Sequence, residues 1–256
     1  MFMLKIKNLK KYFGGIKATD NVSFEIKEGE LVGIIGPNGA GKTTLFNLIS
    51  GNLDPDSGEV YYRENRIDDK PPYEIAKEGL SRVYQVTGGL EKLTNLENVI
   101  FGFRDQMEES LKSIFLKNSY VEKKDKELKE KANKLLKKFS IQKKAKEYPD
   151  SLDGGGLKKL EFLRALASDS DLFLLDEPLS GVSPDGQGTI LEIIEDLNKE
   201  KGKTIIIIEH NVRQIMKVVE RVIVLHQGQI IADGSPPEIR KNEEVKRVYF
   251  GEDYIE

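Results

Sequence analysis

The sequence predicts an α/β fold: a mostly parallel sheet, an antiparallel β-layer near the N-terminus and a helical insertion. Three observations lead to this fold class. Short apolar runs alternate with helical patterns in the second half of the chain, which is typical of parallel sheets. The N-terminal residues alternate apolar and polar side chains, as half-buried strands do. A highly charged segment with one apolar stripe lies between these two regions.

The N-terminal region predicts two strands followed by a third of a different kind. Apolar residues alternate loosely with lysines over Leu4–Leu9 and with polar residues over Val22–Ile26. This pattern indicates strands of an antiparallel layer with one buried face. After a turn at Glu28-Gly29, Leu31–Ile35 is a continuous apolar run, which indicates a strand buried on both faces.

A helix and a hairpin follow this buried strand. The helix is expected from about Thr43 to Ser50, directly after a glycine-rich loop. Val60–Tyr62, a polar turn at Arg63–Asn65 and then Ile67 predict a β-hairpin.

The second half of the chain predicts the remaining strands. Three short apolar runs are separated by helical patterns and indicate parallel strands; they are Leu172–Leu175, Thr204–Ile208 and Val222–Leu225. A turn at Gln227-Gly228 then predicts a return strand at Ile230-Ile231.

Residues 104–147 differ in composition from the rest of the chain. They carry fourteen Lys and Arg against eight Asp and Glu, a charge of +6, whereas the remainder of the chain is −9. Apolar residues recur there at helical spacing; they are Leu128, Ala132, Leu135, Leu136 and Phe139. We expect a helical insertion that packs through this stripe. Its charged face fits either a solvated surface or a surface that binds a partner.

The composition excludes several classes of protein. A chain of 256 residues without cysteine excludes disulfide scaffolds, cysteine-ligated metal sites and thiol nucleophiles. Two histidines exclude a multi-histidine metal centre, and a net charge of −3 argues against a protein that coats nucleic acid. Because no apolar stretch approaches the roughly 20 residues of a membrane helix, and no signal peptide is visible, we expect a cytoplasmic protein.

The segment Gly36–Thr43 fits the pattern G-x-x-x-x-G-K-[ST] and lies between a predicted strand and a predicted helix. Glycines let the backbone curl so that successive N–H groups point at phosphate oxygens, and the helix amino terminus adds partial positive charge. Lys42 is expected to bridge the β- and γ-phosphates, and the Thr43 hydroxyl to ligate Mg²⁺. The predicted phosphate-binding residues are Gly36, Asn38, Gly39, Ala40, Gly41, Lys42, Thr43 and Thr44.

Two carboxylates follow the predicted strand Leu172–Leu175. Parallel strands present their carboxyl ends to the ligand in folds of this type, so Asp176 and Glu177 are expected at the same edge as the phosphate loop. Asp176 is placed to hold the metal through water. Glu177 could polarise an attacking water as general base.

The phosphate loop, Asp176-Glu177-Pro178 and an upstream glycine-rich segment resemble the nucleotide-binding subunits of ABC transporters over nearly the whole chain. The resemblance implies a P-loop NTPase core within a single ABC ATPase domain, with ATP and Mg²⁺ as cofactors. It divides the chain into a RecA-like core with the antiparallel layer, at 1–85 and 165–256, and a helical subdomain at 86–164 that contains the charged insertion 104–147.

The resemblance also implies further site residues. Phe13 corresponds to the aromatic residue that stacks on adenine, with Tyr12 as the alternative. Gln85 corresponds to the glutamine that contacts Mg²⁺ and water and links the site to the membrane subunit. His210 resembles the switch histidine that contacts the γ-phosphate. His226, in the predicted hairpin, is interpreted as structural.

One motif departs from the family pattern. The family's signature is Leu-Ser-Gly-Gly-Gln, which closes over ATP bound to a partner subunit, but here the segment Leu152–Gly156 reads Leu-Asp-Gly-Gly-Gly. Asp153, Gly154 and Gly155 are the residues expected to face the partner's nucleotide. The Asp153 carboxylate replaces a hydroxyl donor and should repel the phosphate, by about 1–4 kcal/mol. As a helix cap, however, aspartate is as good as serine. Ser180–Ser183 also carries serine where many members have aspartate.

The resemblance extends to subtype. Phe13–Ala18 and the ending Val245–Glu252 are similar to ATPases of branched-chain amino-acid importers, and the ending also resembles lipopolysaccharide-export ATPases. The expected function is Mg·ATP hydrolysis that drives solute transport, most simply branched-chain amino-acid uptake. The alternatives are the lipopolysaccharide-export type and a nucleotide-binding switch with weak turnover. The implied partners are permease subunits, a second ATPase subunit in a homo- or heterodimer and, indirectly, a solute-binding protein; nucleic acid is not expected.

Overall fold

The computed structural model describes the backbone of residues 1–84, 89–103 and 118–250, and the side chains of those residues except 118–122 and 249–250. The chain divides into two compact units, which are described separately. The core unit comprises Met1–Arg82, Asp171–Pro178 and Leu191–Glu256, and the helical unit comprises Val83–Ser170 and Leu179–Ile190. Both units contain sequence-distant segments, so neither is a simple N- or C-terminal half.

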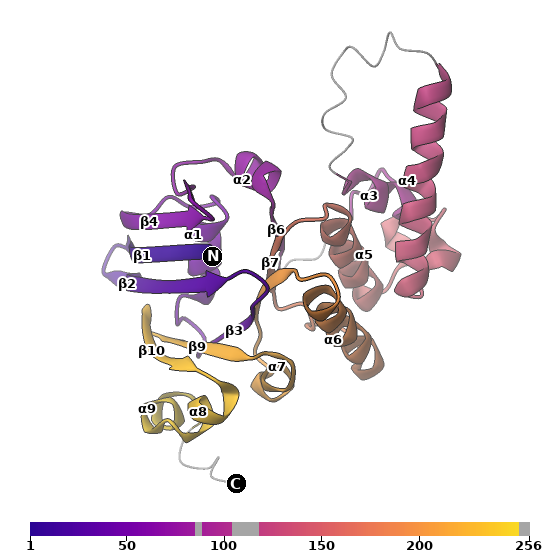
Figure 1. Cartoon of the computed structure of the whole chain (residues 1–256). Coiled ribbons are helices and arrows are strands. Elements are labelled where there is room, and N and C mark those ends of the chain that lie inside the picture. Colours follow the sequence, from indigo (N-terminus) through magenta and orange to yellow (C-terminus); the bar gives the residue numbers. More distant parts are fainter. Residues whose placement is uncertain (85–88, 104–117, 251–256) are drawn as a thin grey trace. The chain divides into compact units, whose positions relative to one another are not determined.

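The first sheet of the core unit is antiparallel and has the order β2-β1-β4-β5 (Figure 1). Its strands are β1 (Phe2–Phe13), β2 (Ile16–Lys27), β4 (Ser57–Tyr62) and β5 (Asn65–Arg66). Leu4, Ile6 and Leu9 are buried, as the alternating pattern predicts. The predicted hairpin turn at Arg63–Asn65 is one residue too long, because Asn65 pairs with Tyr62. Arg63 takes a positive φ of 53°, and this left-handed conformation closes the shorter turn.

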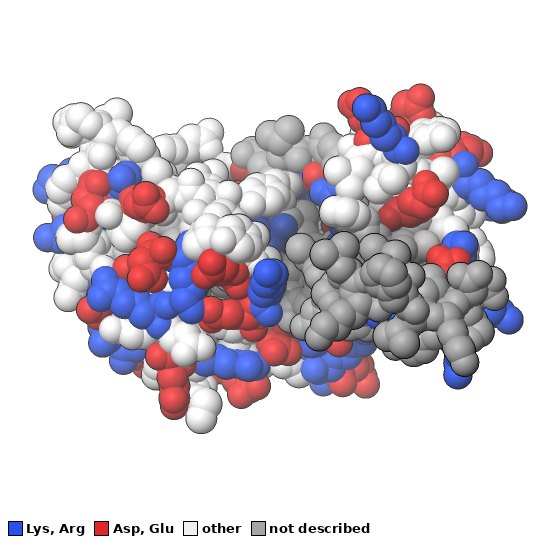
Figure 2. Space-filling view, turned by 90° about the horizontal axis from the view of Figure 1, so that it is seen from above, with Lys and Arg blue, Asp and Glu red and all other residues white. Residues whose placement is uncertain are grey.

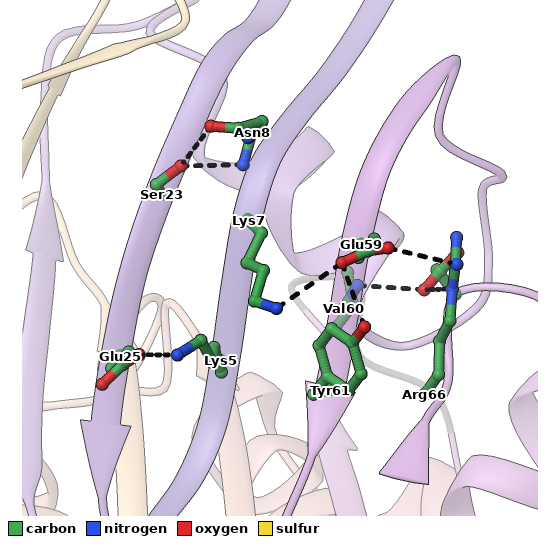
Figure 3. A network of polar contacts seen from close by, with 10 residues as sticks. Lys5, Lys7, Asn8, Ser23, Glu25, Glu59, Val60, Tyr61 and Arg66 are labelled. Carbon is green, nitrogen blue, oxygen red and sulfur yellow. Dashed lines mark hydrogen bonds and ion pairs between the residues drawn. The ribbon is translucent and has the colours of Figure 1, made fainter. Parts of the chain in front are cut away.

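The other face of this sheet carries a ladder of charged side chains (Figure 3). Lys5 lies opposite Glu25 across β1 and β2 and forms an ion pair with it. Lys7 lies opposite Glu59 across β1 and β4, with 3.7 Å between Nζ and Oε2. Arg66 then pairs with Glu59 at 3.3 Å. The side-chain period of two therefore separates an apolar inner face from a charged outer face.

The second sheet of the core unit has the order β10-β9-β3-β8-β7-β6. Its strands are β3 (Leu31–Ile35), β6 (Leu80–Val83), β7 (Leu172–Asp176), β8 (Thr204–Ile208), β9 (Arg221–His226) and β10 (Gln229–Gly234). The strands β9, β3, β8 and β7 run parallel, and β10 returns antiparallel to β9. Every residue of β3, β7 and β8 is buried. The predicted parallel and return strands are confirmed.

The core lies where the two sheets share apolar side chains with α1 (Lys42–Ile49) and α2 (Pro72–Glu78). A single cluster of buried residues joins Leu4 and Ile6 of β1, Phe46 of α1, Leu174 of β7 and Ile206 of β8. The helices that lie wholly within the core unit are short. They are α1 (Lys42–Ile49), α2 (Pro72–Glu78), α7 (Val212–Val218), α8 (Pro236–Lys241) and α9 (Glu243–Val245), followed by a π-helical turn (Lys246–Phe250).

The helical unit contains α3 (Asn95–Phe101), α4 (Asn118–Lys138) and α5 (Gly154–Ala167), with 3₁₀ turns at Gln142–Lys144 and Pro149–Ser151 (Figure 1). Helix α6 (Pro184–Lys199) begins in this unit and continues in the core unit. The predicted apolar stripe is confirmed along α4 and at the residue that follows it. Leu128, Ala132, Leu136 and Phe139 are buried, and Leu135 is half-buried. The Phe139 ring packs against Phe162 of α5, with 5.8 Å between ring centroids.

Among the helices in the described ranges, none is both long enough and apolar enough to cross a membrane. On the face drawn in Figure 2, lysine and arginine side chains are interspersed with aspartate and glutamate. This surface matches a composition in which 32% of the residues are charged.

Candidate functional site

Three parallel strands bring the candidate residues to one edge of the second sheet. β3 leads into Gly36–Thr43, β7 ends at Asp176 and is followed by Glu177, and β8 is followed by Glu209 and His210. Because β3, β8 and β7 are neighbours and run parallel, their carboxyl ends lie at the same edge. In parallel α/β sheets this edge is where ligands bind.

Two glycines of the phosphate loop are required by close backbone contacts. A Cβ on Gly36 would lie 2.2 Å from the carbonyl oxygen of Leu225, and a Cβ on Gly41 would lie 2.0 Å from that of Ala18. Gly41 also has a φ of +102°, a conformation that side chains rarely adopt. The loop is thus pressed against β2 and β9, and its glycines allow a tight curl of main-chain amides.

Lys42 and the first turn of α1 supply positive charge to this loop. The Lys42 side chain is buried, and its Nζ donates to the carbonyl oxygens of Gly36, at 2.8 Å, and Pro37, at 3.0 Å. Burial lowers the pKa of Lys42, while the charges of Glu177 and Asp176 act in the opposite direction. No acidic residue or side-chain cap occupies the first turn of α1, so its amides stay available to an anion.

Glu177 is held in an unusual backbone conformation beside His210. It has a φ of +51°, in the left-handed region, and its N–H donates to the carbonyl oxygen of Ile208 at 2.8 Å. Its Oε1 lies 2.7 Å from Nε2 of His210, whose side chain is 47% exposed. Strained conformations of this kind persist at functional sites. The structure therefore brings together the carboxylate and the imidazole that the sequence places 33 residues apart.

Asp176 makes a contact that the sequence analysis missed. Nη2 of Arg82 lies 3.0 Å from Oδ2 of Asp176, and both side chains are at most 4% exposed. Arg82 lies in β6, three residues before Gln85. The signal that the sequence offers for it is a charged residue within the short segment Leu80-Ser81-Arg82-Val83, which begins and ends with an apolar residue.

The candidate adenine-binding aromatic residues lie at the turn between β1 and β2. The Phe13 ring is 48% exposed, and Lys11 lies over it at 5.9 Å from the ring centroid. The Tyr12 hydroxyl instead donates to Asp20 at 2.6 Å. Phe13 is therefore the freer of the two rings for stacking. The Asp20 N–H donates to the carbonyl oxygen of Gly228, and the Gly228 N–H donates to the carbonyl oxygen of Ala40. Two consecutive hydrogen bonds therefore connect β2 with the phosphate loop.

In the helical unit, Asp153 is the N-cap of α5. Its Oδ1 accepts a hydrogen bond from the N–H of Gly156 at 2.7 Å, which confirms the expected cap. Asp153 and Gly154 are exposed, and a Cβ on Gly154 would meet nothing within 4 Å. The altered signature segment is thus a well-formed helix start with an outward-facing glycine.

Gln85 lies outside the described residues, and its predicted role stays a prediction. Tyr84, just before it, is described: its carbonyl oxygen accepts a hydrogen bond from Nζ of Lys158 at 2.8 Å. Lys158 is buried in α5 and lies 4.0 Å from Glu161 on the same helix. The residue before Gln85 is therefore hydrogen-bonded to α5, the helix that begins at the signature segment.

These residues fit a magnesium–nucleotide complex. A curled glycine loop and a helix start with free amides match a polyphosphate, and a buried ammonium adds a counter-charge. A hydroxyl at Thr43 and a carboxylate at Asp176 are the oxygen donors that Mg²⁺ prefers. Among the described residues, no group of three or more acidic or histidine side chains forms a metal cluster.

Comparison with known proteins places the chain in a family. Residues 19–180 match the model of the ABC transporter family, and residues 229–255 match that of the branched-chain amino acid ATP-binding cassette transporter. A probable branched-chain amino acid transport ATP-binding protein, LivG, of Methanocaldococcus jannaschii is 37% identical, with 98% of each chain covered. The LivG protein of Salmonella typhimurium is 34% identical, again with 98% of each chain covered. The lipopolysaccharide export system ATP-binding protein LptB of Escherichia coli is 35% identical, with 99% of each covered.

Solved structures give the same answer. A nucleotide-free ATP-binding cassette from an ABC transporter is 34% identical, with a TM-score of 0.82 over 98% of this chain and all of that chain. An ADP-bound cassette of an ABC transporter is 33% identical, with a TM-score of 0.81 over 98% of this chain and all of that one. The predicted family and fold class are therefore confirmed. The chain belongs to the ABC transporter family and is an ATP-binding cassette ATPase.

Proposed function

We propose that this chain hydrolyses Mg·ATP to drive the uptake of branched-chain amino acids through a membrane permease. The observation that carries the chemical part is the shared sheet edge, where the phosphate loop, Asp176, Glu177 and His210 meet. The substrate class rests on the match at residues 229–255 and on relatives named for branched-chain amino acid transport. Lipopolysaccharide export is the second candidate, because LptB is 35% identical over nearly the whole chain.

In this proposal each side chain has a distinct task. Lys42 and the loop amides hold the phosphates, with Asn38, Ala40 and Thr44 completing the cradle. Thr43 and Asp176, together with Gln85, serve the metal. Bound Mg²⁺ would neutralise charge that develops on the phosphate oxygens. Phe13 would stack on the base.

Glu177 is the proposed general base. Its carboxylate is nearly buried and lies against His210, which would brace the γ-phosphate. A hydrogen bond from its own N–H to Ile208 fixes the backbone that aims this carboxylate. A base held in one orientation removes a proton from water without the cost of being ordered first.

A second ATPase subunit is part of the proposal. A dimeric cassette bound to ADP and phosphate is known for a chain 30% identical to this one, with a TM-score of 0.76 over 91% of this chain and 99% of that chain. In such a dimer Asp153, Gly154 and Gly155 would face the partner's nucleotide. Because Asp153 brings negative charge to that place, a heterodimer with an intact second site is favoured. The subunit would lie on the cytoplasmic face of the membrane, held by the permease.

The chemical part is tested with Glu177→Gln, which keeps the shape of the side chain and removes its basicity. We expect phosphate release from Mg·ATP to fall at least about tenfold, because a general base contributes 10²–10⁴-fold. Binding of a fluorescent ATP analogue should be retained. Glu64→Gln, in the exposed hairpin turn, is the matched control and should hydrolyse ATP normally.

Retained turnover in Glu177→Gln would show that Glu177 is not the general base.

The transport part is tested separately, by isolating the chain together with its partners from its native membrane. Reconstituted complexes should accumulate radiolabelled leucine in an ATP-dependent way. ATP-dependent release of lipopolysaccharide instead would favour the second candidate.

A further inference from the structure

Arg82 joins two elements of the core unit through one buried guanidinium. Its Nη2 pairs with Asp176 Oδ2 at 3.0 Å. Its Nη1 donates to Asn47 Oδ1 at 2.7 Å and to Ser50 Oγ at 3.0 Å. The guanidinium also lies over the Phe46 ring, 5.6 Å from its centroid. The arginine side chain is 4% exposed, so these contacts are protected from water.

The partners of Arg82 belong to the two elements that carry the candidate metal ligands. Asn47 and Ser50 follow Thr43 by four and seven residues on α1 and its C-cap. Residues at this spacing share one face of a helix. Arg82 is therefore hydrogen-bonded to the face of α1 that carries Thr43. Asp176, at the end of β7, forms an ion pair with Arg82.

We propose that Arg82 is a positioning residue that sets the separation and orientation of Thr43 and Asp176 for the magnesium of Mg·ATP. This inference rests on the proposed hydrolysis of Mg·ATP at this site. A guanidinium is planar and presents its donors in a fixed fork, so it can hold a carboxylate and a helix at a defined spacing. A lysine ammonium at the same place keeps the charge but lacks the fork.

The sign of the effect separates positioning from simple charge compensation. Arg82 is a cation close to a carboxylate that would bind a second cation. If only its charge mattered, removal of Arg82 should strengthen magnesium binding, and a lysine should leave it unchanged. Positioning predicts weaker magnesium binding in both cases, because the Thr43 hydroxyl and the Asp176 carboxylate lose their fixed spacing.

The experiment measures how strongly magnesium assists nucleotide binding. In the Glu177→Gln background, the dissociation constant of mant-ATP is measured by fluorescence with excess Mg²⁺ and with EDTA. The constant measured in EDTA divided by the constant measured with Mg²⁺ is the factor by which magnesium strengthens nucleotide binding. A high ratio therefore means strong coupling between metal and nucleotide. Arg82→Lys and Arg82→Met should each lower this ratio at least about fivefold, a coupling change in the range seen between linked sites. The constant in EDTA should change less than about twofold, because the phosphate loop is untouched.

Arg221→Lys is the matched control. Arg221 makes two 2.7 Å hydrogen bonds to Asp233 in the same unit, but it begins β9, at the opposite end of that strand from the loop. Its replacement should leave the ratio unchanged. Asn47→Ala with Ser50→Ala removes the tie to α1 and keeps the pair with Asp176, and should lower the ratio by itself. This double variant also carries the test if the Arg82 variants do not fold.

An unchanged or increased ratio in Arg82→Lys, or in the double variant, would overturn the positioning role. If the reference protein itself binds mant-ATP equally with and without Mg²⁺, the proposed metal site fails, independently of Arg82. Loss of mant-ATP binding in EDTA would show damage to the phosphate loop and would also overturn the proposal.

Discussion

Charged pairs of the core unit lie in very different surroundings. On the outer face of the antiparallel sheet, Lys7 and Glu59 are 45% and 36% exposed (Figure 3). At the edge of the parallel sheet, Arg82 and Asp176 are 4% and 1% exposed. The ladder follows from cross-strand register alone, whereas the guanidinium of the buried pair lies where β6, β7 and α1 meet. The same pairing of charges thus lies on the surface in one place and at the proposed magnesium site in the other.

Solvent explains the difference. Exposed pairs contribute about 0–1 kcal/mol, because water screens them and long side chains lose entropy on pairing. A buried pair adds little net stability relative to apolar residues, yet loss of one partner leaves a charge with no water around it. We therefore hypothesise that the pair of Arg82 and Asp176 serves the proposed site rather than the stability of the fold. The following changes test this hypothesis.

The largest expected effect is that of Arg82→Met. It removes the Arg82 cation from the buried carboxylate of Asp176, and we expect a loss of about 3–5 kcal/mol in the free energy of unfolding. Urea denaturation followed by circular dichroism measures this loss. The control is Arg63→Met, which breaks an exposed pair with Asp171 and should cost less than about 1 kcal/mol. Equal losses in the two variants would contradict the distinction between the two environments.

A smaller change in unfolding free energy is expected at Asp153. Its exposed carboxylate accepts a hydrogen bond from a main-chain N–H and is not paired with a cation in the helix cap. Asp153→Ala removes the cap of α5 and should cost about 0.5–2 kcal/mol of unfolding free energy. Asp153→Ser keeps a cap and should change the stability by less than about 0.5 kcal/mol. It should also strengthen ATP-driven association with the second subunit, measured by sedimentation of a Glu177→Gln protein. If association does not change, Asp153 does not reach the partner's phosphate.

The charged ladder should respond still less. Lys7→Ala breaks the pair with Glu59 and should lower the unfolding free energy by less than about 1 kcal/mol. A double-mutant cycle with Glu59→Gln isolates the pair from the packing of Lys7 on the Tyr61 ring. A coupling energy as large as that of a buried pair would show that the ladder is more than solvated surface.

The smallest effect is a change in acid stability at Asp20. Hydrogen bonds from Tyr12 and Lys17 lower the pKa of Asp20 from 3.8 to about 2. Because the folded-state pKa lies below the unfolded value, this contribution is complete above about pH 4 and is lost as the pH falls towards 2. Asp20→Asn should flatten the stability profile between pH 4 and 2, measured by urea denaturation. Asp69→Asn, in an exposed turn, should leave that slope as it is.

Much of the fold could be predicted because local patterns carry it. The unbroken apolar runs at Leu31–Ile35 and Thr204–Ile208 are buried strands in the structure. The turn at Arg63 is one residue shorter than the pattern predicts, because its length depends on a left-handed conformation that a non-glycine residue seldom adopts. The phosphate loop was predictable from eight consecutive residues. Arg82 was not, because its partners lie 35 and 94 residues away in the chain.

The sequence alone determined most strands of the two sheets and the residue types of the predicted phosphate loop, since alternation, apolar runs and the glycine pattern act over a few neighbouring residues. It also placed the chain in its family. Only the tertiary structure decided that Glu177 lies against His210 and that Asp176, Asn47 and Ser50 share one guanidinium. The reason is that parallel strands are joined by long crossovers, so the contacts at their ends are made in space between residues whose distance along the chain carries no local signal.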